Sequence, residues 1–508
     1  MRLRTMLTKR SRFALGAALT FLPLLASAQD SLPTRISYVL QTEASVGTGD
    51  YSAYQLVTNR HHIHSTRPNT AYVRGALSVE HALGGGAMLS GCVDGVASLH
   101  ADHQVYLQQC YANLTYKSFF LEAGAREEPP VLRDAELSSG PFAKGINAKP
   151  VPQLHIGTNG FVDIPFTRGW LQANFDGGYG VFLDGDYREQ AYRRSPVVNY
   201  RYATGILYHQ KHLYFRSNPT KPLFVTVGIE HVVQFAGTKH DFVDKEHPKT
   251  VKKPASLKAF WNVILPLGDN KYFENEAMED WVYGNHLGSM TVQLGWNIDR
   301  HHQLEAYLDN PFEDGSGIRK GNGWDGLWGL RYSNTKPGPQ LVRRAVAEYL
   351  QTTNQSGPLH WDRGDYPEPA RSQITDLVVG NDSYYNHTFY SSYDHYGMAL
   401  GTALLLSPIY NKDGQMMFSD SRVKAWHLGL CGELTDNISY IAKGSYREGW
   451  GTYNAPLPIK HHSFDALVKG IYHTGPWQLG ASYAFDLGNI YGDCHTFNFN
   501  VAYHGKIL

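Results

Sequence analysis

The chain has 508 residues, and its 46 basic and 46 acidic side chains give a formal net charge of zero. That balance excludes the strongly basic surface on which nucleic-acid binding depends. No apolar run of about 18 residues occurs after residue 28, which excludes a protein that crosses a membrane with helices. A membrane protein of this sequence must cross with strands.

The first 28 residues have the pattern of a cleavable export signal. Five basic side chains near the start precede an apolar stretch at 13–25 and a small-residue site at 26–28. The apolar stretch is shorter than the roughly 20 residues of a membrane-spanning helix. We expect residues 1–28 to be removed as a signal peptide and residues 29–508 to form the mature chain, with a net charge of about −5.

Segments in which apolar and polar side chains alternate recur from residue 36 to the end of the chain. At 477–487 every odd position is apolar, and similar alternation occurs at 171–181 and 292–298. Alternation gives a strand one apolar and one polar face, as a barrel in lipid requires. We predict an all-β fold, a transmembrane antiparallel β-barrel in a single domain. A soluble β-propeller is the alternative on composition, but no repeat of blade length is found.

The predicted strands can be taken in chain order. They span residues 36–46, 70–82, 86–98, 104–115, 118–125, 168–182, 199–214, 222–235, 255–264, 288–299, 302–308, 325–333, 342–351, 385–391, 422–432, 437–446, 463–473, 477–487 and 495–504. Because single-chain bacterial barrels have an even number of strands, we predict 18, with 16 and 20 as neighbouring counts. The longer polar insertions are expected to be loops, at 126–167, 236–254, 268–286, 309–324 and 352–384.

Ionisable side chains fall on the polar faces of several predicted strands. Arg74 and Arg331 are examples, and we expect both to line a wet lumen. The segment 341–350 could form a short helix by propensity. We prefer a strand in which Arg344 and Glu348 turn into the lumen.

The four cysteines occur in a chain whose expected export permits disulfides. Cys92 and Cys110 are symmetric about a turn expected near residue 101, a register that would place them opposite each other across a hairpin. We predict a disulfide between them, with free thiols as the alternative. Cys431 and Cys494 have no evident partners, and the absence of a Cys-x-x-Cys spacing argues against a zinc site.

Aromatic side chains in probable loops are the first candidates for ligand binding, because sugars pack on aromatic faces with polar groups at the ring edges. The densest run lies between residues 361 and 396. We select as candidate ligand-binding residues Trp361, Tyr366, Tyr384, Tyr385, Tyr390 and Tyr393. The alternative is that several of these tyrosines pack in the lumen or in an interface belt.

Motifs for metal binding and catalysis are weak. The histidine run at 61–64 has no nearby acidic or cysteine partners in sequence, so we interpret it as a polar turn. The chain contains no Gly-x-Ser-x-Gly elbow, no His-Glu-x-x-His helix, no phosphate-binding loop and no dinucleotide fingerprint. We therefore expect no catalytic residues, no metal and no cofactor.

A set of short phrases resembles a known family. In chain order they are 44–50 (ASVGTGD), 56–60 (LVTNR), 162–170 (VDIPFTRGW), 347–350 (AEYL), 354–358 (NQSGP), 384–386 (YYN), 396–397 (YG) and 400–404 (LGTAL). Together they resemble the Wzi-like capsule-assembly family of outer-membrane proteins, in the form found in Bacteroides-type bacteria. The resemblance covers most of the mature chain.

The resemblance implies an 18-stranded outer-membrane barrel with a lectin-like, non-catalytic role in holding capsular polysaccharide at the cell surface. Its expected partners are that polysaccharide, outer-membrane lipid and the polysaccharide export machinery. In the best-known branch a helical bundle plugs the periplasmic end, whereas here strand-like sequence begins near residue 36 and leaves no room for one. A porin for small solutes and a barrel-embedded hydrolase are the alternative functions.

Overall fold

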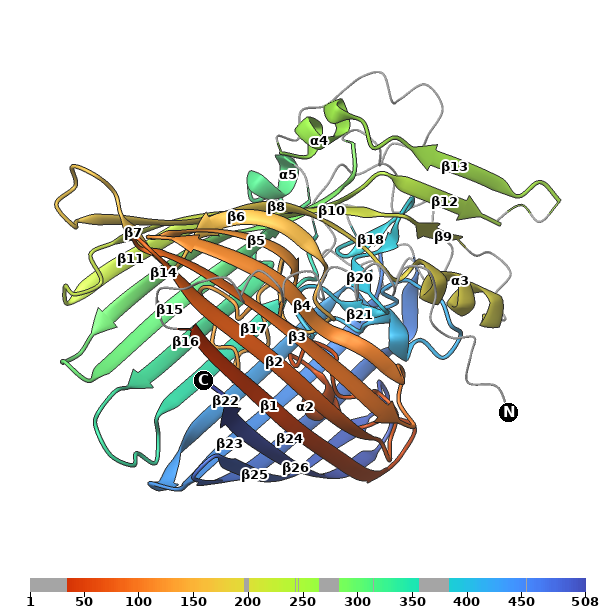
Figure 1. Ribbon diagram of the computed structural model, residues 1–508. Helices are drawn as coiled ribbons and strands as arrows, with labels where there is room; N and C mark the ends of the chain where they lie inside the picture. Colours follow the sequence, from red (N-terminus) through yellow and green to blue (C-terminus); the bar gives the residue numbers. More distant parts are fainter. Residues whose placement is uncertain are drawn as a thin grey trace.

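The computed structural model describes residues 34–195, 201–242, 244, 246–264, 283–313, 315–355, 383–453 and 455–508. Figure 1 shows that most of them form one closed barrel of tilted strands. The predicted fold class, a transmembrane antiparallel β-barrel, is confirmed. The export signal predicted at 1–28 lies outside the described residues.

The barrel has 18 strands, as predicted, because the two-residue β7 (Val162–Asp163) continues β6 along β8. The strands are β1 (Thr34–Thr48), β2 (Ala71–Gly84), β3 (Ala87–Leu99), β4 (Val105–Tyr116), β5 (Phe119–Ala125), β6 (Gln153–Thr158), β8 (Leu171–Val181), β10 (Leu207–Ser217), β11 (Leu223–Phe235), β14 (Asn285–Asn297), β15 (His302–Phe312), β16 (Gly326–Asn334), β17 (Arg344–Gln351), β22 (Val423–Thr435), β23 (Ile438–Gly451), β24 (Pro456–Thr474), β25 (Trp477–Gly488) and β26 (Cys494–Lys506). Antiparallel pairing of β1 with β26 closes the barrel.

The two faces of the wall follow the alternation in the sequence. Along β25, Leu479 and Leu487 are about two-fifths exposed on the outside, whereas Ala484 and Asp486 are fully buried inside. Exposed apolar side chains recur around the whole barrel, among them Leu40, Val73, Leu114, Leu154, Leu213, Val227, Val292, Trp426 and Phe499. An outer face of this kind suits a lipid bilayer.

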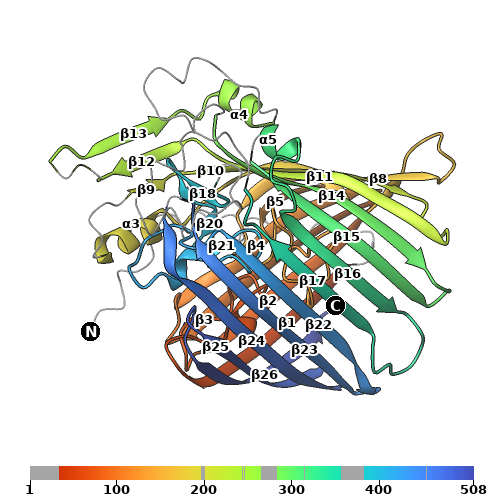
Figure 2. The same cartoon turned by 180° about the vertical axis from the view of Figure 1, so that it is seen from behind.

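The connections at the two ends of the barrel differ in length. At one end, which we call the turn end, tight turns such as Gly85-Gly86 join neighbouring strands. Both glycines have positive φ (+60° and +83°), as two-residue hairpins require. At the opposite end, the loop end, long segments join β1 to β2, β5 to β6, β8 to β10, β11 to β14 and β17 to β22. Figure 2 shows the additional elements gathered at the loop end.

These additional elements are short. They are α3 (Gly185–Arg194), α4 (Leu257–Ile264), α5 (Gly315–Ile318) and a three-stranded sheet of β9 (Arg201–Thr204), β12 (Gly237–Asp241) and β13 (Lys249–Lys253). Among the described residues, no helix is long and apolar enough to span a membrane.

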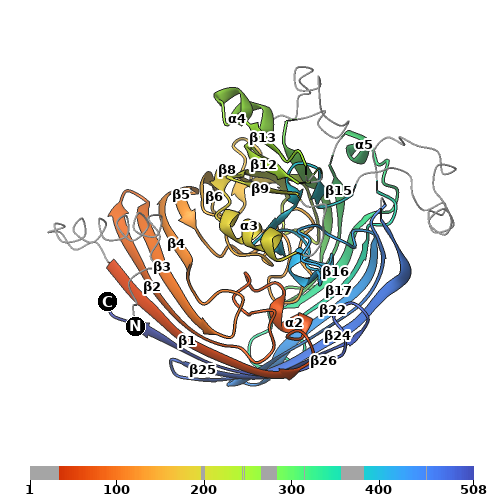
Figure 3. The ribbon, with the colours of Figure 1, turned by 90° about the vertical axis from the view of Figure 1, so that its right-hand side faces the viewer.

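Three segments from the loop end fold into the barrel, and we call them the plug: residues 49–70, 126–152 and 383–422. They contain α2 (Tyr54–Val57), β18 (Asn386–His387), β19 (Ser391–Ser392), β20 (Asp394–His395), β21 (Met398–Ala399) and η5 (Pro408–Tyr410). Figure 3 looks into the loop end and shows α2 and the β18–β21 region inside the ring of strands. The main hydrophobic core joins plug residues such as Phe142 and Leu405 to wall residues such as Leu287 and Leu350.

All but two of the predicted strand ranges overlap barrel strands. The exceptions are 255–264, where apolar residues one turn apart bury one face of the helix α4, and 385–391, which lies in the plug. Strand β6 was missed, since it falls within the predicted loop 126–167. Two predicted ranges are therefore not barrel strands and one barrel strand was missed, yet the predicted number of 18 strands is correct.

The predicted disulfide between Cys92 and Cys110 is wrong, because both cysteines are free. Near the turn the strands pair symmetrically about residue 101, as expected. A bulge at Gln108 then shifts the register by one residue, so Cys110 lies opposite Val93 instead of Cys92. Neighbouring residues of a strand point to opposite faces, which places the two thiols on different sides of the wall.

Candidate functional site

The plug is docked onto ionisable residues of the wall. Arg74, Arg331 and Arg344 line the lumen, as predicted, and β17 is the strand that we preferred at 341–350. Each of the three arginines contacts the plug segment 126–152. The acceptors are Glu127 (2.7 Å), the carbonyl of Leu132 (3.3 Å) and Asp134 (2.6 Å), respectively. The lumen charges therefore hold protein in place, instead of facing only water.

A further, deeply buried contact between plug and wall is the ion pair between Arg133 of the plug and Asp309 of β15. Nη2 and Nε of Arg133 donate to the two carboxylate oxygens at 2.5 and 3.2 Å, and both side chains are 2% exposed. The guanidinium also lies 3.9 Å from the ring centroid of Tyr307. A bidentate pair of this kind sets the position of the plug as well as its affinity for the wall.

Glu348 of β17 provides a second anchor. Its carboxylate accepts hydrogen bonds from Ser138 Oγ (2.7 Å) and from the backbone nitrogen and Oγ of Ser139 (2.7 and 2.6 Å). Further along the same side of the barrel, on β24 and β25, the wall accepts hydrogen bonds from α2: the backbone nitrogen of Tyr54 donates to Asp486 (2.9 Å) and Gln55 Nε2 donates to Asp465 (2.6 Å). The plug is thus attached to widely separated strands.

The candidate ligand-binding tyrosines lie inside the plug. Tyr384, Tyr385, Tyr390 and Tyr393 are at most 1% exposed. Tyr385 donates its hydroxyl hydrogen bond to the carbonyl of Phe142, and Tyr393 donates to the carbonyl of Ala143 at 2.9 Å. Their rings fill the core between plug segments, as in the alternative of packing inside the lumen, so these four tyrosines do not offer exposed faces to a ligand. Trp361 and Tyr366 lie outside the described residues.

A different set of aromatic rings is accessible at the loop end. Tyr106 of β4, Tyr187 of α3 and Tyr396 of the plug are each half-buried, and we call them the mouth tyrosines. All three surround His103, with ring centroids 6.0, 6.1 and 4.9 Å from the imidazole. These rings come from three distant parts of the chain. A search for segments rich in aromatic residues therefore could not identify them.

A serine and a histidine of the plug form a relay with a glutamate of β1. Ser52 Oγ lies 3.2 Å from His64 Nε2, and His64 Nδ1 lies 2.7 Å from Glu43. Ser52 is 1% exposed and donates to the carbonyl of Arg67, while its backbone nitrogen donates to the carbonyl of Thr66. A nucleophile needs access and free donors for an oxyanion, and this arrangement offers neither.

Two histidine features bear on metal binding. The run at 61–64 is a turn, as predicted, with φ near +50° at His61 and His62. Within the described ranges, one group of side chains could hold a metal ion by geometry: Glu122, Glu128 and His155. Arg126, Lys144 and Asp176 already bind these three side chains at 2.7, 2.7 and 2.9 Å, respectively. The group is a salt-bridge network whose own cations occupy the carboxylates.

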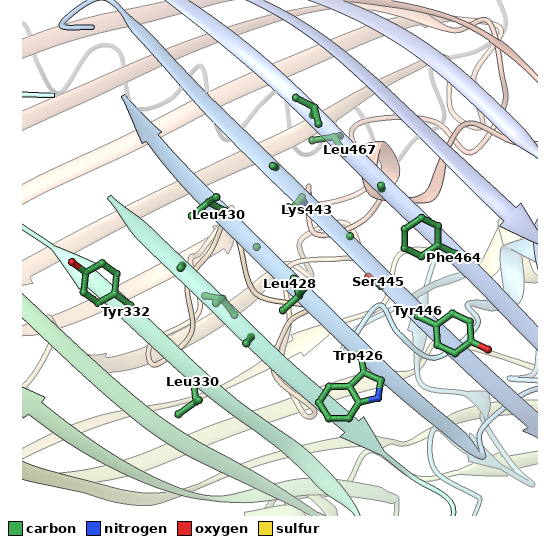
Figure 4. A pocket seen from close by; sticks show the side chains of 18 of the residues that line it. Leu330, Tyr332, Trp426, Leu428, Leu430, Lys443, Ser445, Tyr446, Phe464 and Leu467 are labelled. Carbon is green, nitrogen blue, oxygen red and sulfur yellow. The ribbon is translucent and has the colours of Figure 1, made fainter. Parts of the chain in front are cut away.

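A hollow of about 680 Å³ lies on the outer face of β16, β17 and β22–β24. Figure 4 shows Trp426, Leu428 and Phe464 projecting beside it. The small residues Ala442 and Gly444 are among those that line it. The hollow belongs to the apolar surface that faces lipid, so it is separate from the loop end.

Comparison with solved structures supports the fold. Wzi of Escherichia coli, described as an outer-membrane protein involved in group 1 capsule assembly and a carbohydrate-binding β-barrel, matches with a TM-score of 0.53 at 11% identity. The alignment covers 96% of this chain and 88% of Wzi. This chain has the fold of an outer-membrane β-barrel.

Two proteins of Pseudomonas aeruginosa also align over most of their length. OpdQ has a TM-score of 0.46 at 9% identity, covering 94% of this chain and 98% of OpdQ. OccK5 has a TM-score of 0.45 at 8% identity, with the same coverages. No protein-family model and no curated protein sequence matches the chain.

Proposed function

We propose that this protein is a lectin-like, non-catalytic barrel of the outer membrane that binds capsular or other surface polysaccharide and retains it on the cell. The loop end would be extracellular, since outer-membrane barrels have short periplasmic turns and longer extracellular loops. The outer face would contact outer-membrane lipid. The turn end would then face the periplasm and the polysaccharide export machinery.

The observation that carries this proposal is the packed plug at the loop end. Its core contains fully buried side chains of both plug and wall, including Phe142, Tyr385 and Leu350. A plug docked through buried ion pairs suits a protein that presents a surface more than one that conducts solutes. The mouth tyrosines supply partly exposed aromatic rings, the kind of group on which sugars pack. The fold shared with carbohydrate-binding Wzi agrees with this interpretation.

A porin for sugars or small solutes is the second candidate. The wall alone is compatible with it, because 18 strands can enclose an aqueous channel when the lumen is open. A barrel-embedded hydrolase is less well supported, since the Glu43–His64–Ser52 relay is buried and its donors are occupied. Replacement of Ser52 by alanine, followed by an assay of hydrolysis, would test the hydrolase separately.

The decisive experiment is deletion of the gene, followed by measurement of polymer synthesised and polymer retained on the cell. The proposal expects normal synthesis with polymer shed into the medium, and restoration of retention by the wild-type gene. Planar-bilayer recording of the purified barrel provides the second measurement. Normal retention in the deletion strain, together with steady single-channel current from the purified barrel, would contradict the proposal and favour the porin.

A further inference from the structure

Beneath the mouth tyrosines lies a set of polar side chains that we call the lysine–histidine cluster: Lys149, His62, His103 and His395. Three of them come from the three plug segments, with His395 in β20, and His103 comes from the β3–β4 connection. The imidazoles of His62 and His103 are 5.5 Å apart between centroids, and the backbone carbonyl of Lys149 accepts from His395 Nδ1 at 2.9 Å. The cluster is therefore one compact unit.

The nitrogen atoms of this cluster are buried, and within the part of the chain that the structure describes several of them have no hydrogen-bond partner. These atoms are Lys149 Nζ, both ring nitrogens of His62, His103 Nε2 and His395 Nε2. Lys149, His62 and His395 are 7%, 2% and 1% exposed. Buried polar groups are normally paired, so such a concentration of free donors and acceptors calls for an explanation.

Among the described residues, no carboxylate lies within ion-pair distance of the Lys149 ammonium group. Nζ of Lys149 lies 3.2 Å from the ring centroid of Tyr106 and makes a cation–π contact. Asp102 and Glu127 act on the lysine only at longer range. Oδ2 of Asp102 accepts from Ser65 Oγ (2.9 Å) and from the backbone nitrogen of Thr66 (2.7 Å), and it lies 3.6 Å from His62 Nε2, beyond hydrogen-bond distance. Burial lowers the pKa of Lys149 to about 7, which a bound anion would raise.

The imidazoles complement this cation. Burial lowers the pKa of His62, His103 and His395, so each ring is neutral near pH 7 and offers one donor and one acceptor. Because His395 Nδ1 donates to a carbonyl, its Nε2 is an acceptor. A negatively charged sugar ring matches this set of groups. Its charge would pair with the one cation, its hydroxyls with the imidazole donors and acceptors, and its C–H face with the aromatic rings.

We propose that the lysine–histidine cluster and the mouth tyrosines form a binding site for an acidic sugar residue, a hexuronate whose carboxylate pairs with Lys149. The sugar hydroxyls would meet the free imidazole nitrogens of the cluster, and the C–H face of the ring would pack on Tyr396 or Tyr187. This inference rests on the proposed polysaccharide-binding function and names the chemical class that it selects.

The test is calorimetric titration of the full-length barrel in detergent micelles with a short hexuronic acid oligomer and with a neutral hexose oligomer of the same length. The wild type is expected to prefer the acidic oligomer. Lys149→Met should weaken acidic binding by about 10- to 100-fold, the range for a lost charge-assisted hydrogen bond, and leave neutral binding unchanged. Thermal unfolding checks the fold, which should survive because Lys149 Nζ makes no hydrogen bond to any described residue.

Two further variants sharpen the result. Lys412→Met removes an exposed loop-end lysine that pairs only with Asp50 among the residues described, and it should change neither titration. Tyr396→Leu should weaken acidic and neutral binding by similar factors. If Lys149→Met leaves the ratio of the affinities for the acidic and the neutral oligomer unchanged, the inference is overturned, while the proposed function stands.

Two other outcomes separate the remaining possibilities. Competition by inorganic sulfate as strong as that of the oligomer would indicate a general anion site and overturn the assignment to a sugar acid. Binding of neither oligomer, combined with unchanged capsule retention in the deletion strain, would count against the proposed function itself.

Discussion

The wall and the plug obey different rules of burial. In the wall, a side chain is buried or exposed according to the face of the strand on which it lies, as Leu479 and Asp486 illustrate on β25. In the plug, burial depends on particular partners: Tyr385 and Tyr393 are buried because each reaches a carbonyl of the segment 126–152. Periodicity therefore describes the wall, and specific contacts describe the plug.

Charged residues inside the barrel also have a different role from the one that the strand pattern predicts. Ionisable residues on the inner face of a strand predict a wet lumen. Here Arg344 and Glu348 instead bind Asp134 and Ser139 of the plug. The polar inner face of the wall is thus the surface on which the plug docks. Because the docking contacts are individual side-chain pairs, each can be tested by a separate substitution.

The largest effect is expected from Arg133→Met, which leaves Asp309 buried without its cation. Breaking a buried pair in this way costs about 3 to 5 kcal/mol. The barrel should still assemble, because β15 keeps its backbone ladder, but the plug should loosen. Limited proteolysis of residues 126–152 and bilayer conductance would report the change. A plug as protease-resistant as the wild type would show that this pair does not control docking.

A pH effect of the next size is expected from Lys149. Its pKa is lowered from the ordinary 10.5 to about 7, so between these values the unfolded chain binds a proton that the folded chain has lost. Stability should therefore rise with pH from about 7 to 10, on the order of 3 kcal/mol. Denaturant unfolding of wild type and Lys149→Met across this range isolates the contribution, because the variant should lack it. Parallel pH profiles would refute the prediction.

Close packing inside the plug predicts a smaller loss. A Cβ at Gly401 would lie 2.1 Å from the carbonyl oxygen of Phe142 and from the hydroxyl of Tyr385. Gly401→Ala should cost about 1 to 3 kcal/mol by overpacking. Gly470→Ala is the matched control in the wall, since nothing lies within 4 Å of the added methyl group. Equal melting temperatures for the two variants would contradict the difference between plug and wall.

The smallest effect is expected at the exposed pair of Lys412 and Asp50. Their side chains are about 70% exposed and the two groups are 3.1 Å apart. Lys412→Ala should change the free energy of unfolding by less than about 1 kcal/mol, and less still at high salt. Denaturant titration at two salt concentrations would check this. A loss comparable to that of Arg133→Met would mean that surface pairs also hold the plug.

The strands of the wall could be predicted from local sequence pattern alone. Alternation at 477–487 is a local property of neighbouring residues, and it sufficed to predict strands, the faces of Arg74 and Glu348, and the closed barrel of 18 strands. It failed where strand signals were short, as in β6, or where apolar residues followed a helical period, as in α4.

What fills the barrel, and where a ligand could bind, depend instead on tertiary contacts. The plug, the buried state of Tyr384 and its neighbours, and the bulge at Gln108 that separates Cys92 from Cys110 depend on contacts between distant segments. The mouth tyrosines and Lys149 likewise come together from strands, a helix and two plug segments. A period of two residues shows which side chains lie on the inner and outer faces of a strand. It does not show which side chains from distant segments contact each other across the lumen, because those contacts form only when the barrel has closed.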